Sequence, residues 1–335
     1  DHCGAHIYSV RNREGQKGDA CIMKLKVQRH QTLIISYPTA LILFAAISVY
    51  KPGFASIDHI RVLCSEAAII GVVAIGQTFV IITGGIDLSV AWMVGIAAIM
   101  ITNVTKGLDE SLAWAVPFIL VLTTCFGLVN GICIAYLNMP PIVMTLGMNT
   151  VLQGGLVAVT QGAPGGAAPA FIKKMGQSSF LGIPYLIIIW AVLAAVVTVL
   201  LFKMKYGREL FAVGNNATVA AYSGINVRRV TLTAYAVSGL TAGIAGMLLA
   251  GKVGQSYLGI GDNFQFQSIA AVAIGGTSLM GGNGNYLGTV AGAFTITIIL
   301  GILAALNLPF GVQKMAYGIV VLASVLMSVR KGLRK

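Results

Sequence analysis

Long apolar segments recur along the whole chain, and they limit its fold more than any other feature of the sequence. Hydrophobic residues make up 57% of the chain and charged residues only 10%, against about 25% charged residues in soluble domains. Several of the apolar segments reach the roughly 20 residues that a helix needs to cross a bilayer. The sequence therefore predicts an all-α, polytopic integral membrane protein.

The apolar segments divide into about ten predicted transmembrane helices. By residue number these are 33–50, 67–83, 90–104, 112–137, 142–160, 184–202, 230–250, 268–279, 286–306 and 312–329. The eighth is short, and we expect a broken or re-entrant helix there, which is tolerated only where protein or a water-filled cavity covers the free backbone groups. Residues 23–335 are expected to form a single transmembrane domain.

The first 22 residues differ from the rest of the chain, because they are polar and show no periodicity. They lack the long apolar core of a cleavable signal peptide. We expect residues 1–22 to be a disordered tail. Met23 is the first methionine, so a start at that position is an alternative.

Basic residues indicate how the chain crosses the membrane. Lys and Arg are favoured in cytoplasmic segments, and ten spans with both termini in the cytoplasm place most of the 22 Lys and Arg there. The net charge of +12 follows from this bias, because the basic residues form no aromatic-interleaved patch of the kind that binds nucleic acid. Lys173 and Lys174 are the main exceptions, since they fall in a predicted external loop.

The longest polar and basic stretch between apolar segments runs from Lys203 to Val230. It holds several basic residues and only one acidic residue, Glu209. Clustered Lys and Arg between two spans mark the cytoplasmic side of a membrane protein. We therefore predict a cytoplasmic loop at residues 203–229.

A short helix is predicted inside this loop, at residues 218–223. Asn215 or Asn216 is expected to cap its start, since a side-chain amide oxygen can accept a free backbone N–H. Gly224 is expected to end the helix by adopting a positive φ. A short helix with small side chains in a cytoplasmic loop is a natural docking surface for a soluble partner.

Signatures of catalysis or metal binding do not occur in the sequence. The five cysteines show no metal-ligand spacing, and the four histidines all lie outside the predicted spans. The chain has neither an H-E-x-x-H sequence nor a G-x-x-x-x-G-K-[ST] phosphate-binding loop. We therefore expect no cofactor and no enzymatic activity of the chain itself, and any ATP hydrolysis must come from a partner.

Asp87 is the acidic residue placed closest to the membrane interior, between Gly84-Gly85 and the third predicted span. An ionisable residue within the membrane indicates a functional site, because burying its charge is costly. Alternatively, the carboxylate caps the third span and accepts the free N–H groups of the helix start. The sequence leaves both interpretations open.

Polar side chains within the spans are candidates for lining a path for a polar solute. These candidates are Gln77, Thr78, Asn149, Gln153 and Ser268. Each of them alternatively forms a hydrogen bond between helices, which is worth about 0.6 kcal/mol on average.

Glycines recur at a spacing of four residues within several spans. The pairs are Gly127 and Gly131, Gly239 and Gly243, and Gly288 and Gly292. Small residues at this spacing let helix backbones approach closely. We therefore predict a compact helical bundle.

Three sequence blocks resemble the permease subunits of ribose-type sugar ABC importers, a family with relatives for xylose, arabinose, galactose and autoinducer-2. The blocks are AIGQTFVIITGGIDLSV at 74–90, YGRELFAVGNNATVAAYSGINV at 206–227 and IAAVAIGGTSLMGGNGNYLGT at 269–289. Three blocks in this order make the resemblance specific, and it covers roughly residues 33–329.

The resemblance implies a transport protein that works inside a larger assembly. The partners it implies are two cytoplasmic ATP-binding subunits, a periplasmic or extracellular sugar-binding protein and a second permease copy, either identical or paralogous. The assembly would lie in the bilayer of the bacterial inner membrane and import a monosaccharide or a similar polyol-like solute by alternating access. A secondary transporter that uses Asp87 as its proton or sodium group is the alternative.

Candidate site residues also follow from the resemblance by position. It places Gly85, Asp87 and Ser89 at a helix break near the path. The residues that it assigns to ATPase coupling are Gly214, Asn215, Asn216, Ala220, Ala221, Gly224 and Ile225. This segment agrees with the short docking helix predicted from the residues themselves.

Overall fold

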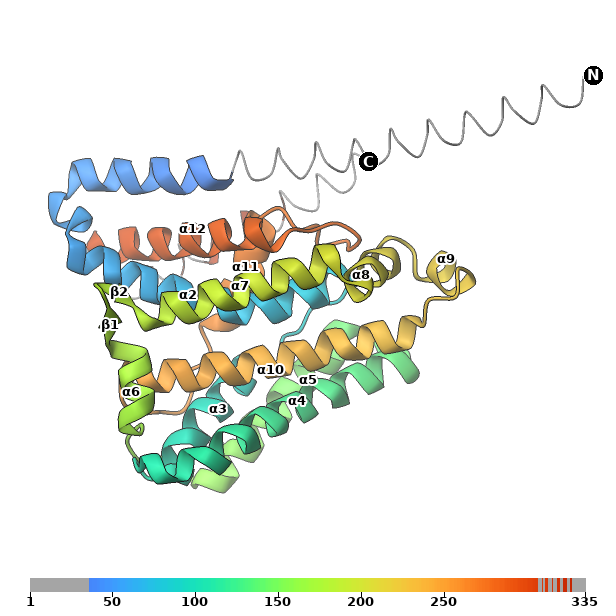
Figure 1. Ribbon diagram of the computed structural model, residues 1–335, viewed down its shortest axis with the longest axis horizontal. Helices are drawn as coiled ribbons and strands as arrows, with labels where there is room; N and C mark the ends of the chain where they lie inside the picture. Colours follow the sequence, from blue (N-terminus) through green and yellow to red (C-terminus); the bar gives the residue numbers. More distant parts are fainter. Residues whose placement is uncertain are drawn as a thin grey trace, which may run out of the picture.

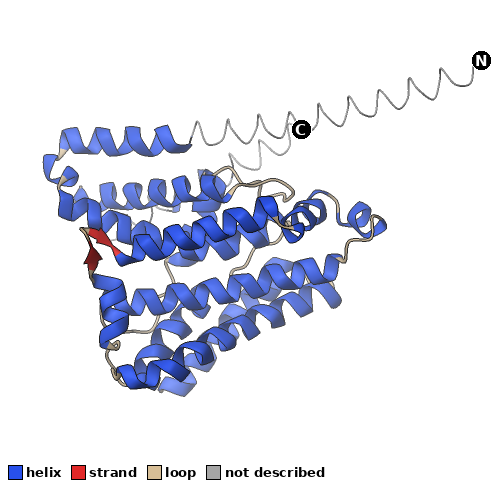
Figure 2. Ribbon diagram, viewed as in Figure 1, coloured by secondary structure: helices blue, strands red, loops and turns tan. Residues whose placement is uncertain are grey.

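The computed structural model describes residues 36–306 and a few positions between 309 and 326. The predicted tail at 1–22, most of the tenth predicted span at 312–329 and the basic residues at 330–335 lie outside the described residues. Figure 2 shows a described part made almost entirely of helices, with one small two-stranded hairpin. The prediction of an all-α fold is confirmed.

The long helices run side by side, and the short elements lie at their ends (Figure 1). After a helix at Ser36–Tyr50, the elements are η1 (Pro52–Ala55), α2 (Ile57–Ile82), α3 (Val90–Thr105), η2 (Asp109–Ser111), α4 (Leu112–Tyr136), α5 (Pro141–Thr160), α6 (Ala170–Gln177), β1 (Ser179–Phe180), β2 (Ile183–Pro184), α7 (Tyr185–Lys203), α8 (Lys205–Asn215), α9 (Ala217–Tyr222), α10 (Val227–Val253), α11 (Phe264–Ile274) and α12 (Tyr286–Ala305).

Six helices of the described part are long and apolar enough to cross a membrane: α2, α4 with the preceding η2, α5, α7, α10 and α12. Three shorter apolar helices accompany them, at Ser36–Tyr50, α3 and α11. Together these helices correspond to the first nine predicted spans. The tenth span stays a prediction, because most of it lies outside the described residues.

Two predicted boundaries differ from the structure. α2 begins at Ile57, well before the predicted span, because the hydroxyl of Ser56 accepts the His59 N–H at 3.3 Å and caps the helix. α11 lies several residues earlier than the predicted span at 268–279, because it begins at Phe264 and ends at Ile274. The next residues are glycines, and Gly276 adopts a φ of +81°, which favours glycine and stops the helix.

α10 and α2 form the centre of the described bundle. α10 packs against α2, α3, α4 and α6, and α2 is buried along nearly its whole apolar length. The largest cluster of buried apolar side chains includes Ile69 of α2, Met93 of α3 and Leu249 of α10. α5 and α7 are mostly exposed, so they lie at the periphery.

The predicted glycine pairs lie where helix backbones touch. A Cβ atom placed on Gly127 of α4 would overlap the backbone of Tyr235 in α10. A Cβ atom on Gly239 of α10 would likewise overlap the backbone of Thr123 in α4. Helices in lipid gain little from hydrophobic burial and associate largely through such close packing. The predicted compact packing of these helices is confirmed.

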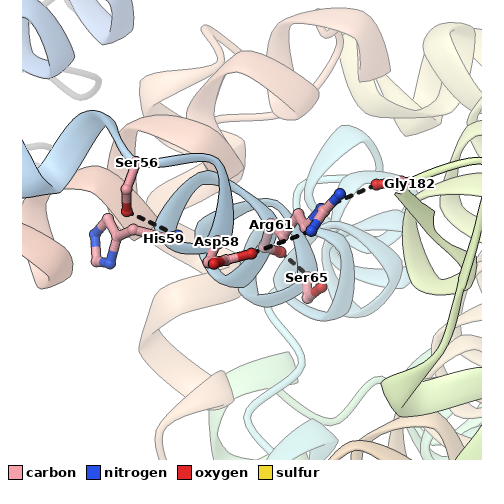
Figure 3. Close-up of polar contacts among 6 residues, drawn as sticks. All are labelled: Ser56, Asp58, His59, Arg61, Ser65 and Gly182. Atoms are coloured by element: carbon pink, nitrogen blue, oxygen red, sulfur yellow. Dashed lines mark hydrogen bonds and ion pairs between the residues drawn. The ribbon is translucent and has the colours of Figure 1, made fainter.

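The two ends of the bundle differ. At one end, which we call the α6 end, α6 and the β1–β2 hairpin lie across the ends of the long helices (Figure 1). Arg61 of α2 binds the hairpin, because its Nε donates to the Gly182 carbonyl oxygen at 3.2 Å (Figure 3). Its Nη1 donates to Asp58 of the same helix at 3.1 Å. At the opposite end, the α9 end, lie α8 and α9.

Replacing Gly239 with alanine is expected to destabilise the bundle. The added methyl group would overlap the backbone of Thr123 in α4, and overpacking of this kind costs about 1–3 kcal/mol. The expected result is a lower melting temperature of the purified protein in detergent, measured by intrinsic fluorescence during heating.

Gly147→Ala in α5 is the matched control, because a Cβ atom there meets no other atom within 4 Å. Its melting temperature should equal or slightly exceed that of the wild type, since alanine favours a helix over glycine by about 1 kcal/mol. Equal melting temperatures for Gly239→Ala and the wild type would contradict the tight contact between α4 and α10.

Candidate functional site

A non-helical break at residues 83–89 separates α2 from α3. Gly84 turns the chain with a φ of +84°, a conformation that favours glycine. Asp87 and Ser89 in this break have no exposed surface. A buried carboxyl group needs hydrogen-bond donors or a cation, so the partners of Asp87 define the site.

The carboxyl group of Asp87 joins the start of α3 to α10. Its Oδ1 accepts the Ser89 backbone N–H at 3.0 Å and the Ser89 hydroxyl at 2.6 Å. Its Oδ2 accepts the hydroxyl of Ser238 in α10 at 2.7 Å. Among the ion pairs of the described residues, none involves Asp87. Neutral donors therefore satisfy both oxygens.

Three further helices hold the same break. Gln77 of α2 donates its side-chain amide to the backbone carbonyl oxygen of Asp87. Asn130 of α4 donates its amide to the Ser89 hydroxyl oxygen at 2.9 Å. The Thr145 hydroxyl of α5 donates to a carbonyl oxygen of the break at 3.2 Å. Including α10, four helices converge on the break.

Asp87 is an anchor between helices more than a helix cap. The N-cap residue of α3 is Ser89. Its N–H is the only backbone N–H recorded as a donor to Asp87 among the described residues. No hydrogen bond recorded for the described residues joins Asp87 to the first turn of α3. The carboxylate thus accepts one N–H at the start of α3 through one oxygen, while its second oxygen binds α10.

Several buried polar atoms around the break have no hydrogen-bond partner among the described residues. They are Gln77 Oε1, Asn130 Oδ1 and Tyr235 Oη. Tyr235 lies beside Gly85, where a Cβ atom would be 2.5 Å from its hydroxyl oxygen. Buried groups of this kind usually bind ordered water. The break is thus a polar centre within a largely apolar bundle.

Two other predicted path residues, Thr78 and Ser268, are also fully buried. The Thr78 hydroxyl lies 3.3 Å from Thr289 Oγ1 of α12. The Ser268 hydroxyl donates to the Gln265 carbonyl oxygen at 3.1 Å. Both hydroxyls donate within one turn of their own helix, since that of Thr78 also donates to the Ala74 carbonyl oxygen at 2.6 Å, and only Thr78 adds a contact to another helix.

Asn149 and Gln153 lie apart from the break, one helical turn from each other on α5. Asn149 is half-buried, and Gln153 is exposed. α5 also exposes Gly147 and Gly154, where a Cβ atom would meet no other atom within 4 Å. The predicted path residues thus form two separate groups, one buried in the bundle and one on a periphery that carries polar and small residues.

The start of α9 has the predicted local structure. Oδ1 of Asn216 accepts the Val219 N–H at 3.0 Å and caps the helix. The helix covers Ala217–Tyr222 instead of the predicted 218–223. Asn216, and not the alternative Asn215, is therefore the capping residue.

The end of α9 also follows the prediction, because Gly224 adopts a φ of +81°. The Gly224 N–H donates to the Ala221 carbonyl oxygen, and the Ile225 N–H donates to the Ala220 carbonyl oxygen, each at 3.0 Å. These are the two hydrogen bonds of a Schellman motif. Both ends of this short helix are thus fixed by their own sequence.

α9 presents its larger side chains to the outside. Val219 is 58% exposed and Tyr222 is 89% exposed, whereas Ala220 is buried within an apolar cluster. Of the residues expected in docking, Ala220 packs inward, while Ala221 and Gly224 are exposed. Val219 and Tyr222 are not among the docking residues predicted from the sequence. Their spacing of three residues, which puts them on one face of the helix, is the signal that indicates them.

Tyr206 fixes α8 to the bundle. Its hydroxyl donates to the Val230 carbonyl oxygen of α10 at 3.3 Å, and its ring stacks on Phe79 of α2 with centroids 6.2 Å apart. Burial raises the pKa of Tyr206 to about 12, so the hydroxyl keeps its proton and its hydrogen bond at physiological pH. The α8–α9 segment is therefore attached to both central helices.

Asp87→Ala is expected to destabilise the protein, because it removes the acceptor of one N–H and two serine hydroxyls. Each buried group left unsatisfied costs about 1–3 kcal/mol. Asp87→Asn should be much milder, since its amide oxygen can still accept from Ser89 and its amide nitrogen can donate to Ser238. Thermal unfolding of the purified variants measures the difference.

Asp58→Ala is the control for removal of a carboxylate. The Asp58 side chain is 93% exposed, and a surface ion pair of this kind contributes at most about 1 kcal/mol. If Asp87→Ala unfolded at the same temperature as Asp58→Ala, Asp87 would not be an anchor between helices.

Comparisons with known proteins agree with this architecture. Residues 61–329 match a family described as "Branched-chain amino acid transport system / permease component". The probable ABC transporter permease protein YphD of Escherichia coli (strain K12) is 34% identical over 313 residues, which cover 93% of this chain and 94% of the relative.

Two further relatives carry the name of a solute. The ribose import permease protein RbsC of Bacillus subtilis (strain 168) is 34% identical over 300 residues, which cover 87% of this chain and 90% of the relative. The autoinducer 2 import system permease protein LsrC of Photorhabdus luminescens is 29% identical over 306 residues, with 91% and 92% covered. No solved structure matches the chain.

These matches extend over most of the chain and confirm the resemblance that the three sequence blocks indicate. The relatives are permease subunits, so ATP hydrolysis belongs to separate partners. The chain therefore belongs to the family of branched-chain amino acid transport system permease components, as a multi-pass inner-membrane subunit of an ABC importer.

Proposed function

We propose that the chain carries a monosaccharide, or a similar small polyol-like solute, into the cytoplasm. The observation that carries this choice is the near full-length similarity to permeases named for ribose and for autoinducer 2. The family description names branched-chain amino acids instead. We favour the sugar-like solute, because the individual relatives are the more specific comparison.

The α9 end faces the cytoplasm in this proposal, and both termini lie on that side. Basic residues surround α9 there, which is typical of cytoplasmic segments. They are Lys203, Lys205, Arg208, Arg228 and Arg229. The ATP-binding subunits dock on the exposed side of α9, with Val219 and Tyr222 as the main apolar contacts.

A second permease copy, identical or paralogous, covers the exposed side of α5. This helix exposes Gln153 and partly exposes Asn149, and lipid offers no hydrogen bonds to such amide groups. Gly154 leaves room for a close approach. A path between two copies, lined by Asn149 and Gln153, would satisfy these groups with water and with the hydroxyls of the solute.

The α6 end faces the outside, where a sugar-binding protein delivers the solute. The long helices are joined to the loops at this end by short hydrogen bonds. The Ala168 N–H donates to the Gly254 carbonyl oxygen at 3.0 Å, and the hydroxyls of Thr102 and Ser256 are 2.6 Å apart. These contacts hold the loops at this end against α3 and α10.

Import proceeds by alternating access that the ATPase subunits drive through α9. Coupling requires two permease states that differ in affinity for the partner, and the break at 83–89 is where four helices converge. A gradient-driven transporter that uses Asp87 is the alternative. Proton relays typically use a chain of ionisable residues, whereas the side-chain partners of Asp87 are two serines.

Tyr222→Ala is expected to weaken binding of the ATP-binding subunits at least about tenfold. Truncation of a central interface tyrosine commonly costs about 2 kcal/mol or more, and about 1.4 kcal/mol corresponds to a factor of ten. The amount of ATPase that copurifies from detergent-solubilised membranes measures this effect, at matched membrane levels of the permease.

Tyr257→Ala is the matched control, because Tyr257 is 53% exposed but follows the opposite end of α10. It should copurify the wild-type amount of ATPase. Wild-type recovery with Tyr222→Ala would exclude this face of α9 as the docking surface.

Gly154→Trp is expected to abolish most of the uptake without lowering the membrane level of the permease. A Cβ atom at Gly154 would meet no other atom within 4 Å, so the larger side chain is expected to leave the chain's own fold in place while it fills the path beside α5. Val199→Trp on α7, at another exposed position, is the control and should transport normally. Normal uptake by Gly154→Trp would contradict a path along α5.

A further inference from the structure

Three chain segments meet backbone to backbone at the α9 end. They are the end of α2 at Ile82, the end of α8 at Gly214 and the loop 281–285 that precedes α12. The Gly282 N–H donates to the Ile82 carbonyl oxygen at 2.9 Å. We call this meeting point the glycine junction.

No side chain fits between these segments. A Cβ atom on Gly214 would overlap the Ile82 carbonyl oxygen, and one on Gly281 would lie 3.0 Å from the Gly214 carbonyl oxygen. Gly281 and Gly282 have φ values of +84° and +71°, which favour glycine. Close-packed backbone of this kind has little room to compress, so displacement of one segment is passed to the others.

Asn215 binds two of the three segments at once. Its Nδ2 donates to the Phe211 carbonyl oxygen of its own helix at 2.8 Å and to the Gly282 carbonyl oxygen at 3.1 Å. The neighbouring Asn216 has the opposite role, because its Oδ1 accepts the Val219 N–H and starts α9. One asparagine acts as a donor to the junction, and the other acts as an acceptor within α9.

Two routes lead from the junction into the bundle. Ile82 is the last residue of α2 and is followed directly by the break that contains Asp87. The loop leads into α12, and its Asn285 caps that helix by accepting the Leu287 N–H at 3.0 Å. A displacement of α8 therefore reaches α2 and α12 together.

We propose that Asn215 is a positioning residue that fastens α8 to loop 281–285, so that movement of the docked α9 shifts α2 and α12 as one unit. This rests on the proposed function, because it requires an ATPase bound to α9. The Asn215 amide acts within the permease and does not contact the ATPase. Its loss uncouples ATP hydrolysis from transport while docking is kept.

Asn215→Asp tests this role with a side chain of nearly the same shape. The substitution places a carboxylate oxygen where the amide nitrogen donates to two carbonyl oxygens. The complete transporter in proteoliposomes gives the readout, which is the amount of solute taken up per ATP hydrolysed. We expect this ratio to fall at least about fivefold, the lower end of typical coupling between sites, while the amount of bound ATPase stays at the wild-type level.

Asn226→Asp is the matched control, because it makes the same change of charge at another asparagine of this end, which caps α10. Aspartate keeps the acceptor for the Arg229 N–H and caps a helix as well as asparagine does, so the ratio should equal that of the wild type. Asn215→Ala removes the donor without adding charge and should reproduce the loss seen with Asn215→Asp. Melting temperatures of all three variants establish that each is folded.

Several results would overturn the role of Asn215. A wild-type ratio in both Asn215 variants would do so and leave the proposed function intact. Equal losses in Asn215→Asp and Asn226→Asp would assign the effect to added charge at the α9 end, and loss of bound ATPase would place Asn215 in the docking surface. Wild-type protein that lacks ATP-dependent uptake would contradict the proposed function itself, and this proposal with it.

Discussion

The buried carboxyl group of Asp87 fixes how the central helices of this permease meet. Its two oxygens are satisfied only while Ser89 at the start of α3 and Ser238 of α10 stay in place. The chain around it is held in turn by Gln77 and Asn130. Sliding α10 past α3 would leave Oδ2 of Asp87 and the hydroxyl of Ser238 unpaired, and each buried group left unpaired is costly. These helices are therefore constrained to move together.

Close contact between backbones at glycines is the second constraint on how the helices pack. It occurs both at the centre of the bundle and at the α9 end. Gly127 and Gly239 bring α4 and α10 into backbone contact, and Gly214 and Gly282 do the same for α8 and the loop before α12. Close contact of this kind allows a short helix at the end of the bundle to act on the spans. α9 exposes Tyr222 away from the bundle, so one face remains for a partner while the other face is fixed.

Local features of this protein are predictable from sequence, and contacts distant in sequence are not. The lengths of the apolar segments indicate the spans, and Asn216 and Gly224 indicate the ends of α9 because capping depends on neighbouring residues. Ser238 lies 151 residues from Asp87, and no local signal connects the two. Nor does the sequence separate buried Thr78 from exposed Gln153, because both are polar residues in apolar helices and differ only in what packs against them.

The source of energy for uptake tests the account most directly. The complete transporter, reconstituted in proteoliposomes, is supplied with ATP on the side of its ATPase subunits while ionophores collapse the proton and sodium gradients. The account predicts that uptake continues at the same rate and stops when ATP is withheld. Uptake that continues without ATP and stops when the gradients collapse would contradict it, and would assign the driving role to Asp87.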